Sequence, residues 1–300
     1  MLRPGLHVLR RSAGELQVGL DPRHALVLPD REPYRSVLDA VTRPGTDLQQ
    51  RAYDAGVLAL LEEAGLLADL NDVLSLVAQR EARLPGSAGD VASVVARCGD
   101  DAAAVLGRRA AARVEVHTHG RGCEAAEEQL HAALARAGCQ VAGAAGAAGA
   151  APPEEPTLGV LVAVGEPPRE MLDAWLREST PHLVVRLSEG HATLGPFVLP
   201  GRTACLRCVD AHLTDVDRAW PLLVAQQATA SALGRLDAVP EPCDPTLATL
   251  VAAWAARDVV THLEGGSPST ASGTLRLSPD LTSLETQTWT RHPGCGCTWD

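Results

Sequence analysis

Two close cysteine pairs, far apart in the chain, constrain the fold of this sequence more than any other feature. Cys205 and Cys208 form a Cys-x-x-Cys pair, and Cys295 and Cys297 form a Cys-x-Cys pair. A Cys-x-x-Cys turn presents two thiolates to one ion, and a second pair from a distant segment completes a tetrahedral four-sulfur site. The pattern therefore predicts that the two segments meet around a zinc ion bound by all four cysteines.

A zinc site of this kind is predicted to be structural. Protein sulfurs fill all four coordination positions, which leaves none open for a reacting water. Zinc binding of about 10 kcal/mol would hold the segment around Cys295 and Cys297 against the core. The alternative is a set of ordinary thiols or a redox pair at Cys205 and Cys208. The remaining four cysteines are single and are interpreted as small buried apolar residues, Cys98, Cys123, Cys139 and Cys243.

The charge balance disfavours several classes of partner, and the distribution of apolar residues indicates the compartment. The 37 acidic residues outnumber the 26 basic ones, giving a net charge of −11, which argues against general binding to nucleic acid or anionic membranes. No apolar run approaches the ~20 residues of a membrane span, and the first residues lack the apolar core of a signal peptide. We therefore expect a cytoplasmic protein with reduced thiols, a setting that favours metal over disulfides.

Lysine is missing from the sequence, because all 26 basic residues are arginine. This excludes a P-loop lysine, a Schiff-base lysine and a lysine general base. Nucleotide chemistry that depends on a lysine is thus disfavoured.

Strands and helices alternate over the middle of the chain, which predicts an α/β domain with a parallel sheet. Residues 113–117 read as a strand, 124–137 as a helix, 157–164 as a continuous apolar strand, 168–178 as a helix and 182–187 as a strand. Further elements are expected as strands at 192–199, 274–277 and 283–290 and as helices at 220–233 and 245–263.

The first part of the chain predicts a separate small module over residues 1–70. Three short strands are expected first, at 6–11, 15–20 and 24–28, and three helices after them, at 32–41, 48–53 and 54–65. This order is winged-helix-like. Residues 71–110 are expected to be a helical connector and residues 111–300 an α/β domain, with a low-complexity loop at 142–156.

The turn after the first parallel strand is a degenerate form of a dinucleotide-binding loop. Gly120 and Gly122 occupy the first two glycine positions and Ala125 the third. Glu124, however, falls in the first helical turn, where its charge competes with a phosphate. We interpret the turn as retained for the fold, with functional nucleotide binding as the less favoured alternative. The roles of Asp210, His212, Gln226 and Gln227 stay open at this level.

Three blocks of the sequence resemble a known family. GPFVLPGRTACLRC at 195–208, DAHLTDVDRAWP at 210–221 and RHPGCGC at 291–297 are similar to the ThiF-like proteins of azole-forming peptide clusters, the TOMM (thiazole/oxazole-modified microcin) group. The resemblance extends over nearly the whole chain and is loosest over residues 71–157. It implies a Rossmann-like fold related to ubiquitin-activating enzymes, with a structural zinc.

The resemblance also implies a function. In that family a module of this type binds the leader of a ribosomally made precursor peptide, which adds as a strand to the module's third strand and packs on its last helix. A separate YcaO-type cyclodehydratase is the implied partner, and a homodimer is possible. The implied peptide-binding residues in this chain are Ala25, Leu26, Val27 and Leu28 on the strand and Val57, Leu60, Leu61 and Ala64 on the helix.

Three hypotheses follow. The first is a non-catalytic scaffold that binds a leader peptide and presents it to the cyclodehydratase. The second is an ATP-dependent enzyme that adenylates a carboxylate, which the degenerate loop and the missing lysine disfavour. The third is a zinc-containing winged-helix regulator that binds DNA, which the acidic charge disfavours. An equally simple interpretation of Val57, Leu60 and Leu61 is that they are core residues.

Overall fold

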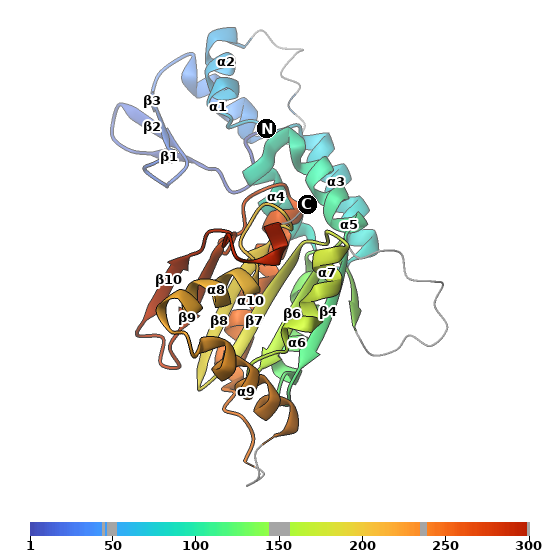
Figure 1. The fold of residues 1–300 in the computed structure, drawn as a ribbon. Helices are drawn as coiled ribbons and strands as arrows, with labels where there is room; N and C mark the ends of the chain where they lie inside the picture. The colour runs from blue at the N-terminus through green and yellow to red at the C-terminus, as the bar shows by residue number, and fades with distance from the viewer. Residues whose placement is uncertain (44–45, 47–52, 144–156, 235–238, 299–300) are drawn as a thin grey trace. The chain divides into compact units, whose positions relative to one another are not determined.

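The computed structural model describes residues 1–43, 46, 53–143, 157–234 and 239–298. The chain divides into two compact units, Met1–Gly107 and Arg108–Asp300 (Figure 1). The helix expected over 48–53 and most of the low-complexity stretch, residues 144–156, lie outside the described residues. Within them, no helix combines the length and the apolar character needed to span a membrane.

The first unit begins with a small antiparallel sheet and two helices. Strands β1 (Val8–Arg10), β2 (Glu15–Val18) and β3 (Leu26–Pro29) are paired in the order β1-β2-β3, so that β3 is an edge strand. Helices α1 (Tyr34–Thr42) and α2 (Ala55–Glu63) follow (Figure 1). The three expected strands and two of the three expected helices are therefore present.

A single apolar core holds this module together. Val18 of β2 and Leu28 of β3 point into it, as the two-residue period of a strand requires, and they pack with Val57 and Leu61 of α2. The side chain of Asp54 caps α2 by accepting a hydrogen bond from the N–H of Val57 at 3.0 Å. The sheet and α2 thus share one core.

The helices expected over residues 71–110 are also present and have a core of their own. They are α3 (Leu70–Arg83), α4 (Ala88–Cys98) and α5 (Ala102–Ala111), with a 3-10 turn η1 at Gly99–Asp101. Asp69 caps α3 through the N–H groups of its first turn. Valines of α3, α4 and α5 pack together in this core, among them Val73, Val91 and Val105.

The second unit is built on a seven-stranded mixed sheet in the order β10-β9-β8-β7-β6-β4-β5 (Figure 1). Within this unit, strands β4 to β7 are parallel to one another. Strands β8, β9 and β10 extend the sheet with antiparallel pairing. The strands are β4 (Arg113–His119), β5 (Gln140–Gly143), β6 (Leu158–Val164), β7 (His182–Ser188), β8 (His191–Val198), β9 (Gly273–Leu277) and β10 (Leu284–Thr288).

Helices cover both faces of this sheet, which explains why β6 is apolar and buried at every position. One face packs against α6 (Glu124–Arg136) and α10 (Pro245–Leu263). The other face packs against a 3-10 turn η2 (Arg169–Leu172), the short helix α7 (Asp173–Arg177) and α8 (Leu206–Val216). The remaining elements are α9 (Trp220–Leu233) and the 3-10 turn η3 (Gly296–Thr298). The predicted α/β sheet with helices on its faces is confirmed.

The structure differs from the expected elements at three places. The helix expected over 168–178 is divided into the 3-10 turn η2 and the five-residue helix α7. Strand β5 was not expected. Helix α8 was not expected either, and Asp210, His212 and Asp215 lie within it.

Candidate metal centre and binding surfaces

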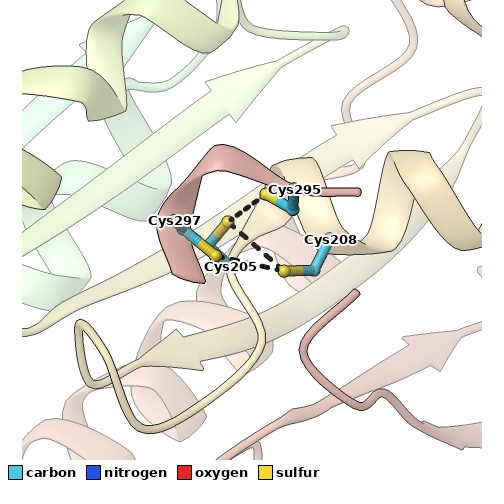
Figure 2. Close-up of side chains that lie close together, drawn as sticks. All are labelled: Cys205, Cys208, Cys295 and Cys297. Carbon is cyan, nitrogen blue, oxygen red and sulfur yellow. Dashed lines mark hydrogen bonds between the residues drawn. The ribbon is translucent and has the colours of Figure 1, made fainter. Parts of the chain in front are cut away.

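The four cysteines of the two pairs come together at the start of α8 (Figure 2). Cys205 is the N-cap residue of α8 and Cys208 lies in its first turn, so both sulfurs point toward the same side of the helix. Cys295 precedes η3 and Cys297 lies within it. The first three are buried and Cys297 is half-buried, which means that the cluster is shielded from bulk water.

The spacing of the sulfur atoms fits a tetrahedral ion. The Sγ atoms of Cys205 and Cys208 are 3.8 Å apart, those of Cys205 and Cys295 3.7 Å, and those of Cys208 and Cys297 3.3 Å. A zinc tetrahedron with Zn–S bonds of about 2.3 Å has sulfur–sulfur edges of about 3.8 Å. No disulfide joins any of the eight cysteines. The residues therefore fit a four-thiolate metal centre, as predicted from the two pairs.

Burial and hydrogen bonds between the sulfurs shift the pKa values of the cluster in opposite directions. The hydrogen bond that Cys205 donates to Cys208, together with burial, raises the pKa of Cys205 above that of an ordinary thiol. The same hydrogen bond lowers the pKa of Cys208, and burial raises the pKa of Cys297. Ionising all four buried thiols would bring several negative charges together, and a bound cation would offset them.

A buried ion pair beside the cluster explains Asp210. Arg169 donates to both oxygens of Asp210, at 2.6 and 2.9 Å, and the indole N–H of Trp220 donates to it at 3.0 Å. Although burial opposes ionisation, these donors hold the pKa of Asp210 below its usual value. Asp210 therefore ties α8 to η2 and to α9, and sequence reasoning did not find this role.

The crevice where a doubly wound sheet binds ligands lies between the ends of β4 and β6, since the strand order reverses there. Gly120 has a φ of +83°, and a Cβ at this position would collide with the carbonyl of Val164. The turn is therefore packed directly on the end of β6. The fold therefore requires a glycine at this position.

Two side chains from later in the chain contact the segments that follow β6 and β4. The hydroxyl of Ser231, from α9, accepts a hydrogen bond from the N–H of Glu166 at 3.2 Å, and a Cβ at Gly165 would collide with that hydroxyl. Cys243 lies against Gly122 and donates to its carbonyl at 3.4 Å. These contacts tie α9 to the end of β6 and Cys243 to the turn, while Gly120, Arg121 and Glu124 of the turn itself are exposed.

The implied peptide-binding residues divide into exposed and buried ones. Val27 of β3 and Leu60 of α2 are 39% and 38% exposed, and Ala64, the C-cap residue of α2, is also exposed. Ala25 and Leu26 are half-buried. The other three belong to the module's core, Leu28, Val57 and Leu61.

Helix α9 presents the most conspicuous apolar surface of the second unit. None of its 14 residues is charged, and only Ala228 and Ser231 are buried. Leu222 is 61% exposed, Leu223 48% and Leu233 82%. Gln226 is exposed and Gln227 half-buried on the same helix. Exposed apolar surface concentrated in this way is typical of protein interfaces.

No protein-family model matches this sequence, and no curated protein matches it. Its fold matches the structure of the heterocyclase TruD with a TM-score of 0.64 and 17% identity, over 99% of this chain and 42% of TruD. It also matches MccB of E. coli with MccA, with a TM-score of 0.60 and 14% identity, over 100% of this chain and 99% of MccB. The match to E. coli MccB with ATP has a TM-score of 0.58 and 14% identity, over 99% and 98% of the two chains.

The fold is therefore the ThiF-type fold that MccB and part of TruD share, and the resemblance found in the sequence is confirmed at the level of the fold. This chain spans about two fifths of the length of the heterocyclase and nearly the whole of MccB.

Proposed function

We propose that this protein is a non-catalytic scaffold of peptide natural-product biosynthesis. Its first unit binds the leader of a ribosomally made precursor peptide, and its second unit engages a YcaO-type cyclodehydratase. The observation that carries the proposal is the open edge of β3. Among the described strands, only β2 pairs with β3, so the other edge offers unpaired backbone donors and acceptors to an added strand.

The surroundings of this edge suit a peptide with apolar side chains. Val27 on the strand and Leu60 on α2 are exposed, while Leu28, Val57 and Leu61 hold the strand and the helix in one core. The buried residues would thus position the two exposed ones. A strand adding to β3 would gain backbone hydrogen bonds, and the exposed apolar side chains would select among sequences.

Two observations favour a scaffold over an adenylating enzyme. Glu124 places a negative charge in the first turn of α6, beside the degenerate loop, and the chain has no lysine to neutralise phosphates. The fold of MccB, which is known with ATP, keeps adenylation as the second candidate.

The surface of α9 favours an interaction with a partner protein. The heterocyclase TruD is more than twice as long as the part that matches this chain, and heterocyclases of this fold are known with substrate and cofactor. We propose that the cyclodehydratase covers the uncharged, exposed helix α9.

The test is a fluorescence titration of the full chain with synthetic leader peptides encoded by neighbouring genes. The proposal expects saturable binding by one of them, together with no leader-dependent exchange of pyrophosphate into ATP. Failure of every candidate leader to bind would overturn the scaffold. Robust pyrophosphate exchange would establish the adenylating enzyme instead, and salt-sensitive retention on duplex DNA would favour the DNA-binding alternative.

A further inference from the structure

Beyond its cysteines, α8 carries two side chains on the same face that contact the segment bearing the second cysteine pair. Cys205, Cys208, His212 and Asp215 are spaced by three, four and three residues, which places them along one side of a helix. The facing segment, residues 290–297, supplies Cys295 and Cys297. One face of α8 therefore meets this segment at four successive positions.

His212 makes the first of the two additional contacts. Its Nε2 lies 2.9 Å from the carbonyl oxygen of Thr290; because a carbonyl only accepts, this nitrogen carries the proton and donates. The ring also packs against Trp289, with ring centroids 5.9 Å apart, and edge-to-face against His292 at 4.8 Å. His212 thus fixes the backbone where the segment leaves β10.

Asp215 makes the second contact, through His292. Its Oδ2 lies 2.9 Å from Nε2 of His292, and Nδ1 of the same ring accepts a hydrogen bond from the N–H of Gly294 at 3.0 Å. These partners place the ring proton on Nε2. The imidazole therefore bridges the carboxylate on α8 and the backbone immediately before Cys295, and both of its nitrogens are used.

The bridged segment also touches the sulfur cluster directly. The backbone N–H of His292 donates to the sulfur of Cys208, and its carbonyl accepts from the N–H of Cys295 at 3.0 Å. An N–H group directed at a thiolate stabilises its charge, and such partners of metal ligands govern affinity as well as orientation.

We propose that His212 and Asp215 are positioning residues of the four-cysteine metal centre: they hold residues 290–295 so that His292 supports Cys208 and delivers Cys295 to the ion. Neither residue is a ligand in this assignment. His212, Asp215 and His292 do place ligand-type atoms within 4.8 Å of one another. However, Nδ1 of His292 accepts from Gly294 and Nε2 donates to Asp215, so the ring offers no free lone pair to a second ion.

The test measures metal retention in the full chain loaded with zinc or cobalt(II). Asp215→Ala and His212→Ala remove the two contacts, and Asp215→Asn keeps a hydrogen-bond acceptor at the same place. The matched control is Asp217→Ala, which changes a carboxylate two residues further along that accepts a hydrogen bond from the N–H of Ala219. The Asp215 side chain is 67% exposed, so its replacement leaves the core packing unchanged.

We expect Asp215→Ala and His212→Ala each to lower zinc affinity by at least about tenfold, the usual effect of losing an outer partner of a metal ligand. The readouts are competition with a chromogenic chelator and the thiolate-to-cobalt charge-transfer absorption, which reports four sulfur ligands. Asp215→Asn should recover most of the affinity, and Asp217→Ala should match the unchanged protein. A purely structural role would change the urea midpoint of the metal-free chain without changing the affinity.

Three results would overturn the proposal. The first is unchanged zinc affinity in both alanine variants. The second is the absence of thiolate-to-cobalt charge-transfer absorption when the unchanged chain is loaded with cobalt(II). The third is two zinc ions per chain, reduced to one by Asp215→Ala, because this would make the three side chains ligands of a second ion. None of these results depends on leader-peptide binding, so the outcome is independent of the proposed function.

Discussion

Leu60 offers the sharpest test of the peptide-binding surface, because it is apolar, exposed and supported by buried neighbours. Its side chain is 38% exposed. Complete burial of a leucine is worth about 1.5–3 kcal/mol, so covering the exposed part with a bound peptide would contribute about 1 kcal/mol, or roughly fivefold in the dissociation constant. Leu60→Ala should therefore weaken leader binding about fivefold.

Leu60→Asp should have a larger effect, since the bound peptide would have to exclude water from an ionised carboxylate. We expect a loss of more than about tenfold in affinity. The assay is a fluorescence anisotropy titration of a labelled leader peptide. The matched control is Leu74, which is 55% exposed on α3 and is changed to the same residues.

The urea midpoint should stay the same in all of these variants, because both leucines are exposed. Equal leader affinities for the Leu60 and Leu74 variants would refute the assignment of α2 to the binding surface.

Three further predictions concern the second unit. Cys205→Ser should abolish stoichiometric zinc in metal analysis of the purified chain, and an unchanged zinc content would contradict the four-thiolate centre. His182 is buried, and burial lowers its pKa from 6.5 to about 4. As the pH falls, the unfolded chain binds this proton at a higher pH than the folded chain does. The free energy of unfolding should therefore fall by about 3 kcal/mol between pH 6.5 and pH 4. In urea titrations at several pH values, His182→Leu should reduce the dependence of the unfolding free energy on pH. An unaltered pH dependence would exclude His182 as its source. Leu223→Glu on α9 should weaken copurification with the cyclodehydratase, whereas Leu284→Glu on β10, 51% exposed, should not; equal losses would exclude α9 as the interface.

The sheet and the metal centre could be predicted from the sequence because their signals are local and chemically specific. Continuous apolar runs such as 158–164 fit only a strand buried on both faces, and few functions other than metal binding require two close cysteine pairs. Helix α8 was missed although Leu206, Val209 and Leu213 recur at helical spacing. The Cys-x-x-Cys pair was interpreted as a turn, so the helical spacing of the apolar residues that begins within it was not recognised.

The peptide-binding surface could not be separated from the core by the same means. Leu60 and Leu61 are neighbours of identical chemistry, yet one is 38% exposed and the other is fully buried. The apolar period of α2 is compatible with a helix that faces the core alone and with one that also contacts a ligand. Only the packing of Leu61 against the sheet distinguishes the two positions, and that contact depends on the tertiary structure.

The acidic start of α6 and the open edge of β3 lead to the same interpretation of this fold. In a doubly wound sheet the ends of the parallel strands form the natural ligand site, and here Glu124 brings a negative charge into the first turn of α6 at that place, where it opposes the charge of a phosphate. At β3, by contrast, an added strand needs no displacement of the described strands, because that edge is unpaired among them. A peptide can therefore bind at the first unit without remodelling its sheet, whereas a nucleotide at the second unit would meet an acidic side chain and no lysine.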